Sequence, residues 1–136
     1  MKGLIRLEEF AQFGACLMLL IMNDVPWWTY LLLLIGPDIG MLGYLVSPQM
    51  GAFTYNVLHH KGIAILLAAW GMTMTASDVL VPGMQGPGTI VLGALVIYGH
   101  ASLDRIFGYG LKFSDAFQHT HLGRIGKMRE PADLSR

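Results

Sequence analysis

Charged residues are scarce in this chain of 136 amino acids. Only 13% of the residues are Asp, Glu, Lys or Arg, whereas 54% are hydrophobic and the mean hydropathy is +0.51. That is too little charge for an ordinary soluble domain. The nine basic and nine acidic residues cancel to a formal net charge of zero, so the charge gives no reason to expect nucleic acid as a partner. We therefore expect an integral membrane protein whose partner is the lipid bilayer.

Several catalytic motifs are also missing. Cys16 is the only cysteine, so no intramolecular disulfide can form. No His-Glu-x-x-His sequence occurs, which excludes a zincin helix, and the absence of Glu-x-x-His counts against a ferritin-type di-iron bundle. Five histidines are too few for the histidine boxes of membrane desaturases.

Long apolar runs are what the chain does contain. They cover Phe10–Met22, Trp27–Val46, Ala52–Met74 and Thr89–Phe107. A membrane-spanning helix needs ~20 largely apolar residues, so four spans are predicted, the first extended backward to include Glu8. A signal peptide is the competing interpretation of this end, but two glutamates and the lack of a small-residue cleavage site argue against it.

The connections between these runs are short, so consecutive helices should be antiparallel neighbours. The sequence predicts an all-α, integral membrane, up-down four-helix bundle over residues 1–110, followed by a cytoplasmic C-terminal tail over 111–136. Pro37, inside the second run, should kink that helix or locally open it.

The basic residues fix the expected orientation. All nine flank the N-terminus, the second connection or the C-terminus, whereas the other two connections carry only Asp24 and Asp78. The positive-inside rule then places both termini in the cytoplasm, with Trp27 and Trp28 at the outer interface. We expect a multi-pass protein of the bacterial inner membrane.

Polar residues inside the apolar runs gather near the basic side. Counting 1.5 Å of rise per residue places them in one layer, about 5–15 Å below the cytoplasmic surface. His100 and Asp104 are spaced i, i+4 and so share a helix face, as do Asn56 and His59. Ionisable residues within a span cost at least ~2.5 kcal/mol each, so they tend to be paired, hydrated or functional. Several of them at one depth indicate a shared site.

This set suits a divalent transition metal, Zn²⁺, Fe²⁺ or Mn²⁺, because imidazole nitrogens and carboxylate oxygens are their usual ligands. A bound metal could activate water for hydrolysis of a lipid-like or amphipathic substrate. The tail histidines could fold back over the site. The candidate metal ligands are His59, His100, Asp104 and His121. The candidate catalytic residues are Glu8 and Asp38. The candidate substrate-binding residues are Asn56, Tyr109, Arg105 and Lys112.

Two other interpretations remain open. The polar layer could be a structural network that fixes helix register in a membrane scaffold, in which case Asp104→Asn would change stability only. It could also carry a proton or cation through a small carrier or channel. Four short spans are too narrow to enclose such a path, so a carrier would be a homo-oligomer.

Four segments resemble a known family. They are Pro37-Asp38 with Met41-Leu42-Gly43-Tyr44, Tyr55-Asn56 with His59, His100 with Asp104-Arg105 and Gly108-Tyr109-Gly110-Leu111-Lys112, and Thr120-His121-Leu122-Gly123. Together with Arg6-Leu7-Glu8, they resemble a family of small bacterial membrane proteins catalogued as domain of unknown function 4260. The resemblance implies a four-helix membrane protein of unassigned activity and carries over no catalytic roles. It adds emphasis to Glu8, Asp38, Asn56, His59, His100, Asp104 and His121 as a set.

Overall fold

The computed structural model describes residues 2–73 and 88–126. It is mostly helical, which confirms the all-α expectation. The elements are α1 (Lys2–Met22), α2 (Trp28–Ile35), the 3₁₀ helix η1 (Pro37–Leu45), α3 (Pro48–Leu58), α4 (Lys61–Thr73) and α5 (Thr89–Phe107), then the short strands β1 (His119–Thr120) and β2 (Gly123–Arg124).

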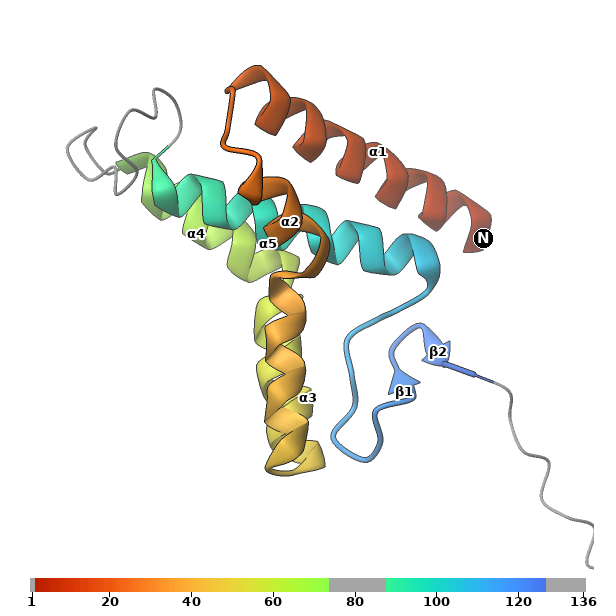
Figure 1. Cartoon of the computed structure of the whole chain (residues 1–136). Helices are drawn as coiled ribbons and strands as arrows, with labels where there is room; N and C mark the ends of the chain where they lie inside the picture. The colour runs from red at the N-terminus through yellow and green to blue at the C-terminus, as the bar shows by residue number, and fades with distance from the viewer. Residues whose placement is uncertain (1, 74–87, 127–136) are drawn as a thin grey trace, which may run out of the picture.

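Helix α5 is the centre of the molecule. It contacts α1, α2, α4 and η1, and Figure 1 shows α1 and α4 running along it on two sides, both antiparallel to it. The buried apolar core lies where α1, α2 and α5 meet, and consists of Leu20, Val25, Leu33 and Leu92. The start of α1 and the end of α5 therefore lie at the same end of the molecule.

The second predicted span is bent. Helix α2 ends at Ile35 and η1 begins at Pro37, and the two helix axes differ by 46°. The cause is local, because proline has no N–H to donate and its ring crowds the preceding turn. The kink that the sequence predicts at Pro37 is thus present in the structure.

The third predicted span is not one continuous helix, which corrects the sequence-based expectation of a single helix from Ala52 to Met74. Helix α3 ends at Leu58, and His59 follows with φ −112° and ψ 9°, outside the helical region. Helix α4 begins only at Lys61. In Figure 1 the η1–α3 pair projects away from the layer of α1, α4 and α5. The break turns the chain from the direction of α3 to that of α4.

The close packing of η1 on α3 depends on small residues. A Cβ added to Gly40 would lie 2.9 Å from the carbonyl oxygen of Thr54, so only glycine fits there. The Thr54 hydroxyl donates to the Gly40 carbonyl at 2.6 Å and joins the two helices. Ser47 caps α3 by accepting a hydrogen bond from the Met50 N–H at 3.1 Å.

Helix α5 ends in a left-handed cap at Gly108, whose φ is +90°. The chain then turns back, and β1 pairs with β2 in an antiparallel hairpin that continues from an isolated bridge between Lys112 and Thr120. Residues 111–126, expected as part of a cytoplasmic tail, thus include an ordered hairpin below the end of α5 (Figure 1).

One helix among the described residues, α5, is long and apolar enough to cross a membrane, and α2 with η1 would add a second if the bent pair forms one span. The core helix of a soluble protein passes the same test, and 39% of the most apolar stretch of α5 is buried inside the protein. Helix α4 is apolar but has 13 residues. Neither four spans nor an inner-membrane location follows from the fold alone.

Candidate metal centre

Four ionisable side chains from three parts of the chain meet beside α5. Asp38 comes from the first turn of η1, His59 from the residue that ends α3, and His100 and Asp104 from consecutive turns of α5. One nitrogen or oxygen of each lies within 4.8 Å of the others. Both imidazoles are buried, at 3% and 1% exposure, whereas the carboxylates are partly open. The group is therefore closed on its histidine side and accessible on its aspartate side.

The two imidazoles are held in the same way. His59 donates its Nδ1–H to the Tyr55 carbonyl at 2.8 Å, and His100 donates its Nδ1–H to the Leu33 carbonyl at 2.9 Å. A carbonyl oxygen can only accept, so in each ring the proton belongs to Nδ1. The other nitrogen, Nε2, is then the free acceptor of each neutral imidazole. A histidine that binds a metal through Nε2 is usually oriented in this way, with its other ring N–H donated to a backbone carbonyl or a carboxylate.

The acceptor nitrogens face acceptor oxygens. His59 Nε2 lies 3.5 Å from Asp38 Oδ1 and 3.4 Å from Asp104 Oδ2, and it has no hydrogen-bond partner within the part of the chain that the structure describes. His100 Nε2 lies 3.4 Å from Asp38 Oδ1, within hydrogen-bonding distance if a proton is present, and 3.8 Å from Asp104 Oδ1. Lone pairs at these distances repel unless a proton or a metal cation lies between them.

These distances suit a metal ion. Tetrahedral Zn²⁺ with bonds of about 2.0–2.2 Å to nitrogen and oxygen separates its ligand atoms by roughly 3.3–3.6 Å. The four nitrogen-to-oxygen distances, 3.4 to 3.8 Å, are close to this range. Two neutral imidazoles and two carboxylates also match the donor preference of Zn²⁺, Fe²⁺ and Mn²⁺. With one atom taken from each residue, the four candidate ligand atoms lie within 4.8 Å of one another, so side-chain adjustments would bring them to the separations of a bound ion.

Tyr55 supports two members of the group. Its hydroxyl donates to Asp104 Oδ2 at 2.6 Å, and its ring stacks on the His59 imidazole with centroids 3.7 Å apart. The side chain is 1% exposed. Because Tyr55 precedes His59 by four residues, one turn of α3 supplies the candidate ligand, the carbonyl that orients it and the ring that packs on it.

Lys112 lies in a cage of aromatic rings beside this group. The residue is 4% exposed, and its Nζ lies 4.0 Å from the ring centroid of Phe117, 5.1 Å from that of Tyr55 and 5.7 Å from that of Tyr109. It has no hydrogen-bond partner among the described residues. Burial lowers the pKa of Lys112, although the carboxylates of Asp104 and Asp38 oppose the change.

Asn56 holds the segment that carries Lys112. Its side-chain oxygen accepts from the Lys112 N–H at 2.7 Å, and its amide nitrogen donates to the Lys112 carbonyl at 2.8 Å. A single side chain thus pairs with both backbone groups of one residue. The contact gives Asn56 a visible role as an anchor, whereas its predicted role in substrate binding stays a prediction.

The remaining predicted residues lie outside the four-residue group. Glu8 is exposed, and its carboxylate accepts from Gln12 at 3.1 Å. Arg105 forms an ion pair with Glu9 at 3.6 Å. His121, predicted as a metal ligand, instead accepts from the Leu111 N–H through its Nδ1 at 2.8 Å. The tail does fold back, but it does not bring His121 to the other candidate ligands.

His119 likewise turns to a neighbour, because its Nδ1–H donates to Asp115 at 2.8 Å. This hydrogen bond lowers the pKa of the Asp115 carboxyl. Neither histidine of the tail therefore supplies a nitrogen to the cluster.

Sequence reasoning missed a second polar cluster, which joins α1, α4 and α5. Glu9 is 7% exposed and pairs with Lys61 as well as with Arg105. Lys61 also donates to Gln12, which accepts from the Tyr98 hydroxyl at 2.9 Å. A signal was present, since Glu9 shares its helix face with Cys16 and Leu20, both apolar and both buried.

The fold and the cluster define a mostly helical protein with a candidate His₂Asp₂ metal centre. The chain belongs to the family described as Domain of unknown function (DUF4260), whose model matches residues 2–125. No curated protein and no solved structure matches it significantly. The family membership confirms the resemblance seen in the sequence and assigns no activity.

Proposed function

We propose that this chain is an integral membrane enzyme that holds one divalent transition-metal ion and hydrolyses an amphipathic substrate near the cytoplasmic side. The observation that carries the metal is the paired orientation of the imidazoles. Both Nδ1–H groups are bound to backbone carbonyls, and both Nε2 atoms face a carboxylate oxygen of Asp38 at 3.4–3.5 Å. A structural salt-bridge network would need protons on those nitrogens at the same time, in a buried place.

Large exposed apolar side chains support a location in the membrane. Helix α1 exposes Leu4, Phe10 and Met22 by 63% or more, and α4 exposes Leu66 and Met72 by 71% or more. Apolar surface of this extent is unusual on a soluble monomer and suits lipid.

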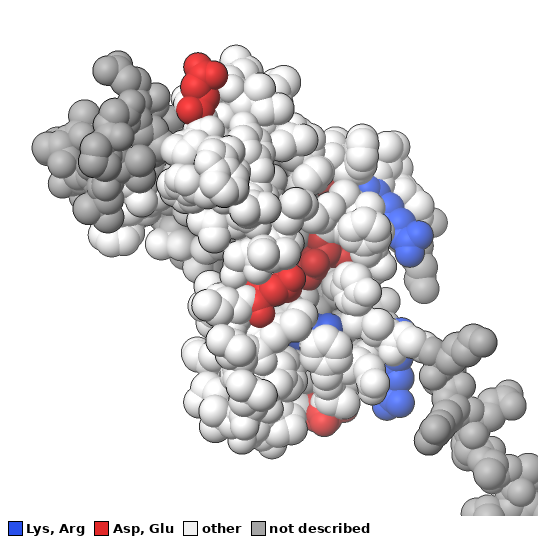
Figure 2. Space-filling model, viewed as in Figure 1, with Lys and Arg blue, Asp and Glu red and all other residues white. Residues whose placement is uncertain are grey.

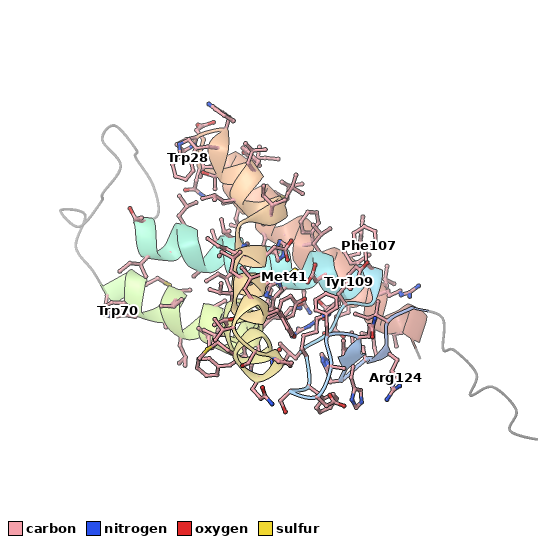
Figure 3. All side chains as sticks on the ribbon, turned by 60° about the horizontal axis from the view of Figure 1, so that its bottom comes forward. Trp28, Met41, Trp70, Phe107, Tyr109 and Arg124 are labelled. Atoms are coloured by element: carbon pink, nitrogen blue, oxygen red, sulfur yellow. The ribbon has the colours of Figure 1, made fainter. Side chains whose placement is uncertain are left out.

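The charge distribution supports the orientation. In Figure 2 the basic residues of the visible face lie toward the end with the hairpin, whereas most of the remaining surface is uncharged. Figure 3 shows Trp28 and Trp70 far from Arg124, as expected for aromatic residues at one interface and cations at the other.

The four residues of the metal centre would have two roles, metal ligand and general base. His59, His100 and Asp104 are the more buried members and would hold the ion, whose contribution is to lower the pKa of a bound water. Asp38, with a side chain 37% exposed, lies on the open side. It would accept the proton that the attacking water loses and pass it to the leaving group. Glu8 lies outside the cluster and takes no part in this scheme.

Metal content is the direct test of the centre. Protein purified in detergent without chelator should contain about one transition-metal ion per chain, measured by elemental mass spectrometry. His59→Ala, His100→Ala and Asp104→Ala should each retain less than about a tenth of it, since each removes one ligand. The matched control is His60→Ala, which removes an exposed imidazole next to His59. Wild-type protein that stays empty after loading with zinc, iron or manganese would contradict the proposal.

The hydrolytic role needs a separate measurement. Asp38→Asn should keep its metal but lose cleavage of a p-nitrophenyl acyl ester or of bis-p-nitrophenyl phosphate in mixed micelles. Metal retained with no cleavage by the wild type, together with metal flux into reconstituted vesicles, would instead favour the carrier.

A further inference from the structure

Apart from the metal centre, the structure has a cavity beside the end of α5. It has a volume of about 490 Å³, is partly open to the surface, and is lined by the first turns of α1, the end of α5 and the β1–β2 hairpin. None of the four residues of the metal centre lines it. Its size falls within the usual range for small-molecule sites, roughly 300–1,000 Å³. Figure 3 shows Phe107 and Tyr109 at the end of α5 and Arg124 further down, on the hairpin.

The lining is positively charged. Arg6, Arg105 and Arg124 all contribute to it, and no carboxylate does. Arg105 has a partner in Glu9, but Arg6 and Arg124 form no ion pair with the residues that the structure describes. The start of α1 and the end of α5 contribute opposite helix-dipole charges of about half a unit each, which nearly cancel. The guanidinium groups therefore decide the sign of the potential in the cavity.

The lining is also partly apolar. Ile5, Phe107, Leu122 and Ile125 share the walls with the arginines. The guanidinium group suits phosphate because its planar fork donates two parallel hydrogen bonds to the phosphate oxygens. Cations beside apolar side chains suit a molecule with an anionic head and a hydrocarbon part. A free inorganic ion would leave the apolar walls unused.

We propose that this cavity binds the phosphate group of an amphiphile, with Arg6, Arg105 and Arg124 around the phosphate and the apolar walls against the hydrocarbon part. The site stands on its own lining and not on the metal centre. Tyr109 lies between the cavity and the surroundings of the metal centre, because it lines the cavity and its ring centroid lies 5.7 Å from Lys112 Nζ.

The test measures the binding of dihexanoyl phosphatidic acid, glycerol 3-phosphate and dihexanoyl phosphatidylcholine to detergent-purified full-length protein by calorimetry. Phosphatidic acid should bind, and Arg6→Gln and Arg124→Gln should each weaken it at least tenfold. Arg105 is left intact because of its ion pair with Glu9. Gln118→Ala changes an exposed side chain just before β1 that does not line the cavity, and this variant should bind like the wild type.

The three probes separate the sources of the phosphate. If glycerol 3-phosphate binds more weakly than phosphatidic acid and loses affinity in the same two variants, the ligand is an amphiphile. If the two compounds bind with equal affinity, the ligand is a soluble phosphate ester. Equal affinity for phosphatidylcholine, or unchanged binding in both arginine variants, would overturn the proposal. Metal content should stay at the wild-type level in both variants, so failure here is distinguishable from failure of the metal centre.

Discussion

Tyr55 shows how much a single side chain contributes to the candidate centre, since it contacts one histidine and one aspartate at once. Tyr55→Phe keeps the ring on His59 and removes only the hydrogen bond to Asp104. Loss of a side chain that hydrogen-bonds to a metal ligand typically weakens metal binding by about 10- to 100-fold. A chelator-competition titration of the purified variant should show that loss. Tyr98→Phe removes a hydroxyl that bonds to Gln12 instead and should leave metal affinity unchanged; equal affinities in both variants would contradict the role given to Tyr55.

Lys112 is a buried amine without a hydrogen-bond partner in the described part of the chain, which makes it costly for stability. Its pKa in the folded protein is lowered by burial, so between that pKa and the ordinary value of 10.5 the unfolded chain binds more protons. Folding stability should then rise with pH across this window. Lys112→Met removes the group and should be more stable than the wild type near pH 7, with a difference that shrinks toward pH 10. Chemical unfolding in micelles at several pH values measures this, and a difference independent of pH would show that the amine is not the cause.

The sequence could show which residues lie close together where spacing along one helix decides, but not where the rotation of a helix decides. His100 and Asp104 share a face at any rotation of α5, and the structure brings them together. The choice between Glu8 and Glu9 depends on the angle at which α1 faces its neighbours, about 100° per residue. The sequence interpretation favoured Glu8 for the site, whereas the structure buries Glu9 and exposes Glu8. Polar residues carry no hydropathy signal of their own, so only the phase of nearby buried residues could have separated them.

The Glu9 cluster acts at the scale of whole elements, because its ion pairs join α1 to the first residue of α4 and to the last turn of α5. Glu9→Ala would leave the partly buried Lys61 without its carboxylate. Breaking a fully buried pair costs about 3–5 kcal/mol, and we expect the lower end here because Lys61 is 13% exposed and keeps its contact with Gln12. Glu8→Ala, one residue away and exposed, should stay within about ±0.5 kcal/mol. The free energy of unfolding in micelles compares the two variants. Equal effects would mean that the ion pair does not hold these helices together.

Breaks within elements were only partly predictable. The kink at Pro37 can be predicted from the sequence, because proline removes a backbone hydrogen-bond donor wherever it occurs. The break at His59 has only a weak marker, because Gly62 follows three residues later and glycine disfavours a helix without excluding it. His59 contacts a residue distant in sequence, because its ring lies edge-on to that of His100 on α5 with centroids 4.9 Å apart. A helix interruption that depends on partners distant in sequence cannot be seen in the local pattern.

At the scale of the whole molecule, the proposed membrane orientation rests on the separation of basic residues from tryptophans. It predicts opposite sides for Trp27, which is 73% exposed just before α2, and Ser114, which is exposed after α5. In a Cys16→Ala background, which removes the one native thiol, Trp27→Cys should react with a membrane-impermeant maleimide in intact spheroplasts. Ser114→Cys should react only after the membrane is opened, because positively charged ends are retained in the cytoplasm. The reverse pattern would invert the orientation, and recovery of the protein in the soluble fraction would remove the membrane from the proposal while leaving the metal test in force.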